Sequence, residues 1–490
     1  MELKVKNINI ESGGPLVAVL NEKDAMELGL HALDRVTIKK LNSKKHTIAV
    51  VDISDFGVKK GELGLFDEVM RDLKVRHNSK VDVVLAQKPR SIKFIQDKLD
   101  GKTLTAKEIN YIINDVVNKR FSEVELTYFV AAVYINGFNF KETAALTKAI
   151  VDSGSKLKFK NKVIFDKHCA GGVANNRTTM IVVPILAALG YIIPKTSSRA
   201  ITSPAGTSDT VEVLTPVSLS EKKIIEVVKK TNGCMVWGGA VNLAAADDIL
   251  IKVRRPLRVD PEGMLLASIL AKKKAVGATH VLIDLPYGYG AKFATKKEAK
   301  ILGKKFIILA KLLGMNTKVV YTDGSQPIGN GVGPVLEVND VLNVLKGNGP
   351  NDLREKSIYI ATEMLKMIRV KNAKSKVLDI LDSKKAYNKF LDIIVAQGGK
   401  RNIKLPKANF YFEVKAYKTG VVKNINNKYI SKIARDAGVP KDKAAGIYLR
   451  VKKGYKVKKG EVLFTIYAEN KPKLDAAIAS LKDYKPFIIP

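Results

Sequence analysis

The sequence of 490 residues predicts a multidomain α/β protein, and three patterns along the chain support this prediction. Between residues 156 and 408, short apolar runs alternate with helical ones, which is typical of a mostly parallel sheet covered by helices. Before this region the apolar spacing is helical, whereas both ends of the chain alternate with a period of two, as strands do. Hydrophobic residues make up 46% of the chain, enough for a substantial core.

The first two predicted domains are a β-rich N-terminal domain over residues 1–84 and a helical domain over residues 85–155. The first contains the strand-like runs HTIAVVDI and KVDVVL, which Gly-bearing turns separate. In the second, three capping-box patterns predict the starts of successive helices. These patterns are Thr105 with Glu108, Ser122 with Glu125, and Asn139 with Glu142. Ser218 with Glu221 predicts a later helix ending at Gly233, and we expect residues 217–233 to return to the helical domain.

The remaining two predicted domains are a central, mostly parallel α/β domain over residues 156–408 and a β-rich C-terminal domain over residues 409–490. Three apolar runs of the central domain are typical of buried strands. These runs are VIFD at 163–166, HVLIDL at 280–285 and NTKVVYTD at 316–323. In the C-terminal domain the period of two returns on both sides of one helical segment, KYISKIARDAGV, so an α+β arrangement is expected.

The charge of the chain favours small phosphorylated partners over nucleic acid. The formal net charge is +36, and the 84 basic residues comprise 15 Arg and 69 Lys (84 − 15), spread along the whole chain. Nucleic-acid surfaces usually gather Arg with aromatic residues, so a lysine-biased genome or a hot habitat explains the charge better. A basic nucleic-acid-binding protein is the alternative from another class. A positive field also attracts phosphorylated small molecules.

The sequence also bears on location. Cys169 and Cys234 are the only cysteines, which excludes a disulfide framework and a Cys-rich zinc site. No apolar run reaches the length of a membrane span, and the first residues, MELKVKNINI, lack the apolar region of a signal peptide. We therefore expect a cytoplasmic protein with no membrane partner.

The first candidate site is the stretch FDKHCAGGVANNRTT at 165–179, where a predicted strand gives way to a loop and then a helix. Ligands of open α/β sheets bind at the carboxyl ends of strands, and the first N–H groups of a helix attract anions. Gly171 and Gly172 would let the backbone approach a phosphate closely, and Lys167 and Arg177 add positive charge. A tight βα turn without a ligand is the alternative.

The second candidate site is the stretch KTSSRAITSPAGTSDTVE at 195–212. Eight of its eighteen residues are Ser or Thr, and they surround the single Arg199. Many short hydroxyl donors around one guanidinium suit a bound phosphate or ribose. Asp209 and Glu212 follow the hydroxyls, where they could orient the Arg instead of repelling an anion. A Ser/Thr-rich surface loop is the alternative.

Three motifs in register resemble the thymidine/pyrimidine-nucleoside phosphorylase family over about residues 90–480. SSRAITSPAGTSDTVE is similar to the family signature, DKHCAGGV to its phosphate loop, and LLASILAKK at 265–273 to its base-site helix. The family's pyrimidine-binding Tyr and Arg are replaced by Leu250 and Val253, and Cys169 stands where the family has Ser. The stretch RRPLRVDPEGM at 254–264 and the extra N-terminal domain resemble the archaeal AMP phosphorylase branch of the family.

The resemblance implies phosphorolysis of nucleoside 5′-monophosphates, chiefly AMP with phosphate to adenine and ribose 1,5-bisphosphate, with CMP and UMP as further candidate substrates. It implies inorganic phosphate as co-substrate with no cofactor and no metal, and a homodimer or larger homo-oligomer joined through the helical domain. It assigns phosphate binding to Lys167, Ser197 and Thr178. It assigns nucleotide binding to Gly172, Ser198, Arg199, Ala200, Ile201, Thr202, Ser203, Thr207, Ser268 and Lys292.

The resemblance offers Asp260 as the proton donor to the leaving base, and His168 as the alternative acid. For Asp260 to donate near pH 7, burial or a neighbouring like charge would have to raise its pKa; without a catalytic role it would cap the following helix. An unperturbed His titrates near ~6.5, which suits proton transfer. The cation that holds the 5′-phosphate is open among Arg199, Lys292 and Arg255.

Family members close their helical domain over the α/β domain, and we expect hinges near Gly154 and Gly233. A pyrimidine-nucleoside or thymidine phosphorylase is the alternative enzyme, which a panel of nucleotides and nucleosides would distinguish. A reaction like that of anthranilate phosphoribosyltransferase would need diphosphate and metal ligands that the sequence does not show.

Overall fold

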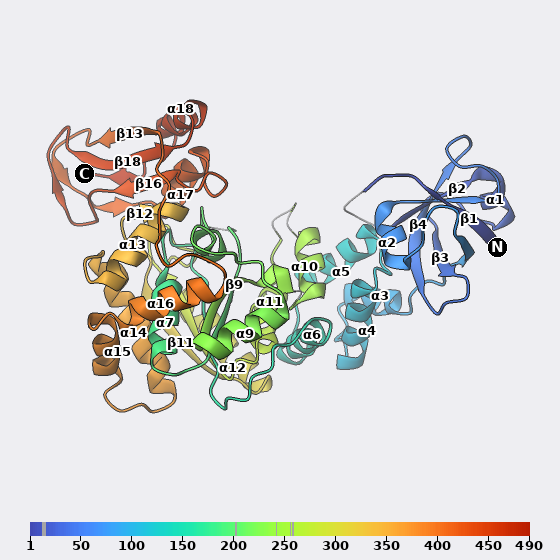
Figure 1. Cartoon of the computed structure of the whole chain (residues 1–490), viewed down its shortest axis with the longest axis horizontal. Helices are drawn as coiled ribbons and strands as arrows, with labels where there is room; N and C mark the ends of the chain where they lie inside the picture. The colour runs from blue at the N-terminus through green and yellow to red at the C-terminus, as the bar shows by residue number, and fades with distance from the viewer. Residues whose placement is uncertain (12–15, 201–202, 242, 255, 257–258) are drawn as a thin grey trace. The chain divides into compact units, whose positions relative to one another are not determined.

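The computed structural model describes residues 1–11, 16–200, 203–241, 243–254, 256 and 259–490. The chain forms two compact units, whose elements are labelled in Figure 1. Unit 1 comprises Met1–Ser153 and Ala245–Leu265, and unit 2 comprises Gly154–Ala244 and Leu266–Pro490. No helix of the described part is long and apolar enough to cross a membrane.

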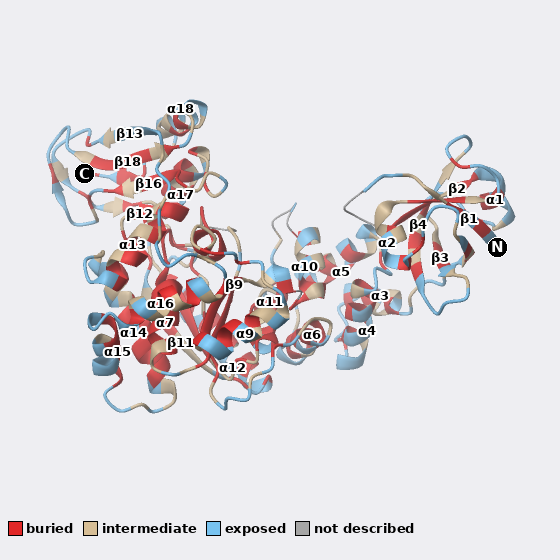
Figure 2. Cartoon of the chain, viewed as in Figure 1, coloured by how far each residue is buried: buried red, intermediate tan, exposed pale blue. Residues whose placement is uncertain are grey.

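Unit 1 begins with a small closed β-barrel, as the β-rich prediction for the first residues required. Its strands follow the order β1-β5-β2-β4-β3-β6, and closure pairs every strand on both sides. Alternate side chains such as Val5, Leu20 and Ile38 fill the barrel, and buried residues along its strands are red in Figure 2. The elements are β1 (Glu2–Asn7), β2 (Val17–Asn21), α1 (Glu22–Glu27), β3 (Arg35–Lys40), β4 (His46–Ser54), β5 (Glu62–Leu65), α2 (Asp67–Leu73) and β6 (Lys80–Leu85).

The rest of unit 1 is helical, and its helices start where the sequence predicted. Thr105, Ser122 and Asn139 each accept from the backbone N–H three residues later, and the matching Glu side chains complete the capping boxes. The helices are α3 (Ser91–Leu99), α4 (Ala106–Val117), α5 (Glu123–Asn136), α6 (Phe140–Asp152) and α10 (Ala245–Arg254). Helix α10 packs on α4, α5 and α6, so a segment that follows the middle of the chain completes this bundle.

The predicted return of residues 217–233 to the helical domain is wrong. Helix α9 (Glu221–Thr231) packs on β8, β9 and α16 within unit 2, because its apolar stripe of Ile224, Val227 and Val228 is buried there. Its N-cap is Ser220, which accepts from Lys223 N, and not Ser218. Gly233 is the buried first residue of β9 inside unit 2, so it is no joint between the units, whereas Gly154 lies at their boundary.

The centre of unit 2 is the parallel α/β arrangement that the apolar runs predicted. Strands β11, β10 and β7 form one parallel sheet, β8 and β9 form a second parallel pair, and an Ile164–Ile192 bridge links the two. The strands are β7 (Phe165–Cys169), β8 (Ile193–Ser197), β9 (Gly233–Trp237), β10 (His280–Tyr287) and β11 (Asn316–Asp323). The helices are α7 (Thr178–Ala188), α8 (Thr207–Val211), η1 (Gly238–Val241), α12 (Lys296–Leu312), α13 (Pro334–Lys346), α14 (Asn351–Met367), α15 (Ala373–Asp382) and α16 (Lys385–Ala396). Helix α11 (Glu262–Ala275) runs across the boundary of the units.

The C-terminal part of unit 2 is β-rich, and it borrows a strand from the central region. The four-stranded sheet has the order β12-β16-β18-β13, so Gly331 and Val332, which precede α13, pair with a strand near the end of the chain. The elements are β12 (Gly331–Val332), β13 (Phe410–Lys415), β14 (Gly420–Val421), β15 (Asn424–Ile425), α17 (Asn427–Asp436), β16 (Gly446–Leu449), β17 (Lys456–Val457), β18 (Val462–Ala468), α18 (Lys471–Ala479), η2 (Ser480–Lys482) and β19 (Phe487–Ile488). This pairing joins the C-terminal sheet to the segment that precedes α13.

Candidate active site

Strand β7 carries a buried lysine at its middle residue. Lys167 Nζ lies 2.5 Å from Thr178 Oγ1, at the first residue of α7, so two predicted phosphate ligands are adjacent. Burial lowers the pKa of Lys167, although the nearby Cys169 and Asp284 act in the opposite sense. An ammonium and a hydroxyl beside the N–H groups that begin a helix are the donors that a phosphate needs.

Next to Lys167 in the sequence, the carboxylate of Asp166 forms ion pairs with two further buried lysines. Asp166 Oδ1 lies 3.0 Å from Lys195 Nζ, and Asp166 Oδ2 lies 2.7 Å from Lys273 Nζ. Burial alone would raise the pKa of Asp166, but the two ammonium groups together lower it. Lys195 also donates to the Lys167 carbonyl at 2.8 Å, so this triad fixes the backbone that presents Lys167. The sequence reasoning missed the triad because its members come from three distant segments.

His168 lies between these lysines and is a neutral imidazole near pH 7. Burial lowers its pKa well below the ordinary 6.5, and Lys273, Lys195, Lys167 and Lys272 lower it further. The surroundings of His168 therefore differ from those of the unperturbed histidine that the sequence analysis considered. A neutral ring can still donate or accept a hydrogen bond, but it carries no positive charge to offer as an acid.

The glycine loop, residues 170–176 after β7, is held by a backbone contact from Lys292 and by a contact between two side chains at its ends. Gly172 has a φ of +62°, in the left-handed region that favours glycine, and Lys292 N donates to the Gly171 carbonyl at 3.0 Å. The predicted nucleotide residue Lys292 therefore lies next to the loop. Asn176 Nδ2 donates to Cys169 Sγ at 2.9 Å. Burial, and then Asp284, raise the pKa of the Cys169 thiol to about 12, so a neutral thiol occupies the position of the family's hydroxyl.

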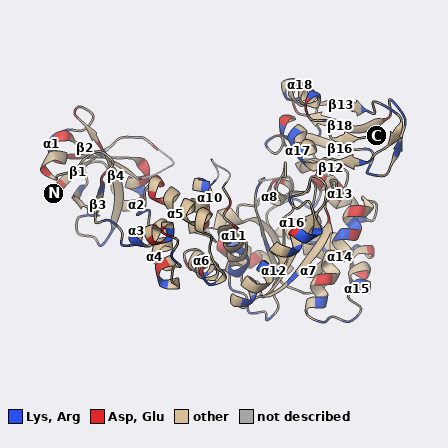
Figure 3. Cartoon of the chain, turned by 180° about the vertical axis from the view of Figure 1, so that it is seen from behind, with Lys and Arg blue, Asp and Glu red and all other residues tan. Residues whose placement is uncertain are grey.

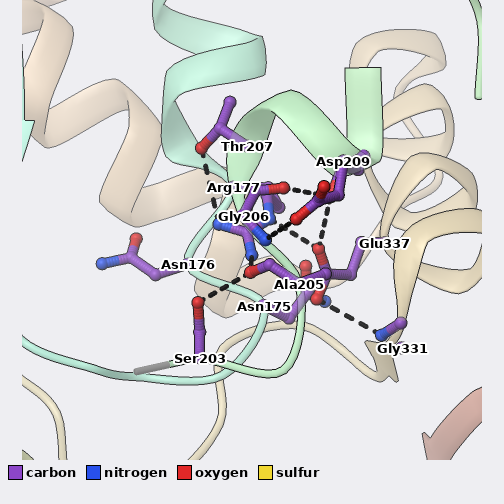
Figure 4. Close-up of polar contacts among 12 residues, drawn as sticks. Asn175, Asn176, Arg177, Ser203, Ala205, Gly206, Thr207, Asp209, Gly331 and Glu337 are labelled. Carbon is purple, nitrogen blue, oxygen red and sulfur yellow. Dashed lines mark hydrogen bonds and ion pairs between the residues drawn. The ribbon is translucent and has the colours of Figure 1, made fainter. Parts of the chain in front are cut away.

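Arg177 joins the glycine loop to the hydroxyl-rich loop, as Figure 4 shows. Its Nε lies 2.5 Å from Glu337 Oε2, its Nη2 donates to the Ala205 carbonyl, and its Nη1 lies 3.5 Å from Thr207 Oγ1. Glu337 also accepts from Thr210 Oγ1 at 2.8 Å, so α13 holds α8 as well. Arg177 is thus committed to structure, where the sequence had offered it as a cation beside the phosphate.

A second carboxylate of α13 and one of α8 complete the support of these loops. Asp340 accepts from Asn175 Nδ2 at 2.7 Å and from Gly331 N at 2.8 Å. Asp209 accepts from Ala200 N at 2.7 Å and from Gly206 N at 2.8 Å. Gly206 is required by space, since an added Cβ would meet the Arg199 backbone carbon at 2.4 Å. The single carboxylate of Asp209 therefore holds the hydroxyl-rich loop at Ala200 and Gly206, whereas Asp340 holds Asn175 of the segment after β7.

Some hydroxyl groups of this stretch donate hydrogen bonds to backbone carbonyls, and one is buried without a hydrogen-bond partner among the described residues. Ser203 Oγ donates to the Ala205 carbonyl at 2.7 Å, and Ser208 Oγ donates to the Ser197 carbonyl at 3.0 Å. Ser197 Oγ is buried and has no hydrogen-bond partner within the described residues. A buried hydroxyl without a partner is uncommon, because desolvation then goes uncompensated, which suits the predicted role of Ser197 as a phosphate ligand.

Arg199 is oriented by the two carboxylates that follow the hydroxyls, as their spacing allowed. Its Nη1 lies 3.2 Å from Asp209 Oδ1 and 2.8 Å from Glu212 Oε2, and its Nη2 lies 2.7 Å from Glu212 Oε1. The Arg199 hydrogen bonds, and after them a hydrogen bond from Lys443, lower the pKa of Glu212 to about 2. The guanidinium also stacks on Trp237, with Cζ 4.9 Å from the ring centroid.

Helix α11 brings the predicted base-site serine to the same region of unit 2. Ser268 is buried, and Lys272 Nζ lies 3.4 Å from its Oγ. The next residue, Lys273, belongs to the Asp166 triad. Lys272 therefore joins the site residues that the sequence reasoning did not name, although it stands in the LLASILAKK motif.

The predicted proton donor Asp260 belongs to unit 1, where its surroundings differ from those expected. Its side chain is half exposed, and Oδ1 lies 3.1 Å from Arg254 Nη1. The same guanidinium lies 3.6 Å from Asp247 Oδ1, so one arginine contacts two carboxylates of unit 1. Ile201, Thr202 and Arg255 lie outside the described residues.

In the described part of the chain, no group of three or more His, Cys, Asp or Glu side chains is arranged to hold a metal ion. Lys and Arg lie on elements of both units, interspersed with Asp and Glu (Figure 3). The site described above has its own positive charges, Lys167, Lys272 and Lys292, on β7, on α11 and next to the glycine loop.

Three family models match successive parts of the chain. A glycosyl transferase family helical bundle domain matches residues 92–154, the a/b domain of the same family matches residues 161–387, and a pyrimidine nucleoside phosphorylase C-terminal domain matches residues 421–486. Among solved structures, the chain is similar to anthranilate phosphoribosyltransferase from Thermus thermophilus, with a TM-score of 0.51 and 17% identity over 62% of this chain and 98% of that one. The enzyme from Saccharomyces cerevisiae gives a TM-score of 0.51 and 14% identity over 64% and 98%. These likenesses show the fold alone.

Curated relatives match over the whole length. An AMP phosphorylase from Thermococcus kodakarensis is 44% identical over 100% of this chain and 98% of its own length. Those from Pyrococcus furiosus and Methanococcus aeolicus are 43% and 41% identical, over 100% and 98% of this chain and 98% and 95% of their own lengths. The chain therefore belongs to the archaeal AMP phosphorylase branch of the thymidine/pyrimidine-nucleoside phosphorylase family.

Proposed function

We propose that this chain catalyses the phosphorolysis of nucleoside 5′-monophosphates, chiefly AMP with phosphate to adenine and ribose 1,5-bisphosphate. One observation carries the proposal. Lys167 of β7 lies beside Thr178 at the start of α7, and the hydroxyl-rich loop follows the neighbouring strand β8, in a chain that matches AMP phosphorylases over its full length. CMP and UMP are further candidate substrates.

The proposed reaction breaks the bond between the anomeric carbon and the base nitrogen, and the electron pair leaves with the base. An oxygen of inorganic phosphate forms the new bond to the anomeric carbon. Lys167, Thr178 and Ser197 hold that phosphate in line, since positioning can supply ~7–11 kcal/mol of the barrier. The backbone of the glycine loop and the hydroxyl-rich loop bind the sugar and its 5′-phosphate, with Ser268 at the base.

The leaving base needs a proton, because negative charge develops on it as the bond breaks. We propose Asp260 as the donor on the pattern of the branch, with acid catalysis typically worth ~10²–10⁴ in rate. His168 is neutral near pH 7 because burial and the lysines lower its pKa. Its proposed role is therefore a hydrogen bond to the nucleotide and not the delivery of the proton.

The enzyme is proposed to act in the cytoplasm as a homodimer or larger homo-oligomer, with phosphate as its only co-substrate. It is proposed to need neither a cofactor nor a metal ion and to bind no nucleic acid. Activity that survives extensive chelation, and sedimentation at the mass of two or more chains, are the expected results. Loss of activity on chelation that Mg²⁺ or Zn²⁺ restores would refute the metal-free proposal.

A substrate panel tests the proposed function. Purified protein is incubated with AMP, CMP, UMP, adenosine, uridine or thymidine, with and without phosphate, and the free base is measured by chromatography. We expect base release from AMP that requires phosphate and little release from unphosphorylated nucleosides. Release chiefly from uridine or thymidine would favour the pyrimidine-nucleoside alternative, and no release from any substrate would refute a phosphorylase.

A further inference from the structure

A series of side-chain contacts that begins in the C-terminal region holds Arg199 in place. Both of its Nη atoms bind Glu212, Nη1 also contacts Asp209, and the guanidinium stacks on Trp237. The two carboxylates therefore exceed its single positive charge by one. In this arrangement Arg199 fixes the start of the hydroxyl-rich loop, and its position depends on what holds Glu212.

Glu212 is held by a lysine of the C-terminal region. Lys443 Nζ lies 3.0 Å from Glu212 Oε2, the same oxygen that accepts from Arg199 Nη1. One carboxylate oxygen thus bridges an arginine of the nucleotide loop and a lysine that is 231 residues away in sequence. The Lys443 ammonium adds a positive charge to an arginine flanked by two acids, which brings the cluster to formal neutrality.

The segment that carries Lys443 is anchored independently of the loop. Val335 N, at the start of α13, donates to the Lys443 carbonyl at 3.1 Å. The preceding residue, Asp442, forms an ion pair with Lys473 of α18, with contacts of 2.6 and 2.8 Å. The backbone at Lys443 is therefore fixed by two helices, so the side chain reaches Glu212 from a rigid base.

A second contact from the C-terminal region reaches the same loop. Arg435, near the end of α17, donates through Nη2 to the Ser203 carbonyl at 3.3 Å. Ser203 and Glu212 lie on either side of Gly206, the residue that packs against the Arg199 backbone. The C-terminal region thus contacts the hydroxyl-rich loop before and after its turn.

We propose that Lys443 is a positioning residue of the nucleotide site, which acts through Glu212 and Arg199 to hold the hydroxyl-rich loop in its binding conformation. The proposal rests on the proposed function, since it makes the C-terminal region part of nucleoside-monophosphate binding. It places Lys443 at no reacting atom. Loss of its charge should therefore weaken binding of the nucleotide more than it slows the chemical step.

The test compares Lys443→Met with Lys441→Met, a matched control that removes the same charge from an exposed position two residues away. For Lys443→Met we expect KM for AMP to rise about two- to fivefold, the size of one partly exposed ion pair, with kcat changed less than about twofold. Lys441→Met should match the wild type, and Lys443→Arg should restore most of the affinity. An unchanged KM in Lys443→Met, or an equal rise in Lys441→Met, would overturn the proposal.

A second readout does not depend on activity. Trp237 is the only tryptophan of the chain, and Arg199 covers one face of its ring. Acrylamide should quench its fluorescence more strongly in Lys443→Met than in the wild type or in Lys441→Met, because a loosened Arg199 uncovers the ring. If the wild type does not act on AMP, the proposed function fails while this comparison still decides whether Lys443 holds Arg199. Equal quenching in all three proteins would overturn the proposal whatever the kinetics.

Glu212→Gln guards against a variant that fails to fold. It preserves the shape of the side chain but removes the shared charge, so it should reproduce both the KM rise and the increased quenching. Adding Lys443→Met to Glu212→Gln should raise KM little further, since Lys443 reaches Arg199 only through the Glu212 carboxylate. Fully additive effects on KM would show that Lys443 and Glu212 act separately, and would overturn the proposal.

Discussion

Replacing Asp166 with Asn tests whether one buried carboxylate neutralises the two lysines beside it. Asp166 contacts Lys195 at 3.0 Å and Lys273 at 2.7 Å, and the exposed fractions of the three side chains are 0%, 6% and 4%. Asparagine keeps the shape and removes the charge, so two ammonium groups would lose their counter-charge. Removing one partner of a buried ion pair typically costs about 3–5 kcal/mol.

The free energy needed to deprotonate one lysine sets an upper limit to the loss of folding stability. A lysine that ordinarily titrates near 10.4 is neutralised at pH 7 at a cost of 1.36 × 3.4, or about 4.6 kcal/mol. Burial already lowers the pKa of Lys273 despite the attraction of Asp166, so Lys273 should be the residue that gives up its proton. We therefore expect Asp166→Asn to lower the free energy of unfolding by about 3 to 4.6 kcal/mol at pH 7.

The sign of the pH dependence follows from the same proton. In the variant the native state holds fewer protons than the unfolded chain between the lowered pKa of Lys273 and its ordinary value near 10.4. Stability of the variant should therefore rise with pH, by up to about 2.7 kcal/mol between pH 7 and pH 9, and the wild type, in which burial already lowers the pKa of Lys273, should show a smaller rise. The double variant Asp166→Asn/Lys273→Met removes the uncompensated charge, so it should recover most of the stability and lose this rise.

Urea unfolding followed by Trp237 fluorescence measures the effect within unit 2, because Trp237 ends the strand that pairs with the strand of Lys195. The control is Asp392→Asn, which removes an exposed partner of Arg401 in the same unit and should change stability by less than about 1 kcal/mol. A loss below about 1 kcal/mol in Asp166→Asn would refute the claim that Asp166 neutralises its neighbours.

Three further predictions concern single residues of the site. The ¹⁵N shifts of the His168 ring should remain those of a neutral imidazole from pH 7 to pH 5.5, because burial and the lysines lower its pKa; a titration centred near ~6.5 would contradict this. Its native state binds fewer protons than the unfolded chain just below pH ~6.5, so acidification there should cost stability. Arg177→Lys keeps the charge but cannot bridge Glu337 and the loop, so KM for AMP should rise about tenfold; an unchanged KM would remove Arg177 from this role. Asp260→Asn should lower kcat about 10²–10⁴-fold with nucleotide affinity largely intact, and a near-normal kcat would exclude Asp260 as the proton donor.

Local patterns predicted the elements of this fold, because their signals lie within a few residues. The capping boxes at Thr105, Ser122 and Asn139 fixed three helix starts, since the side chain and its partner are three residues apart. The apolar runs predicted β7, β10 and β11 for the same reason. The helix after Ser220 was assigned to the wrong unit, because an amphipathic stripe shows that a face is buried and not what buries it.

Contacts between residues that are far apart in the chain could not be predicted from the sequence. Nothing around Gly331 and Val332 indicates a strand that completes the C-terminal sheet, and nothing near Glu337 indicates that it holds Arg177. The chemistry-bearing stretches were found because hydroxyls, glycines and lysines are concentrated in them. The residues that support these stretches include Asp166 and Glu337. In the sequence they cannot be distinguished from other acidic residues, because their partners are far away along the chain.

The central claim is that the chain transfers the ribose 5-phosphate of AMP to inorganic phosphate. The most direct test follows both phosphate groups during the reaction. In a ³¹P NMR time course with wild-type protein, AMP and inorganic phosphate, both starting resonances should decrease together. Two new phosphate-ester resonances of equal intensity should appear, one for each phosphate of a single sugar. Release of adenine while inorganic phosphate stays constant, which is hydrolysis to ribose 5-phosphate, would contradict the account.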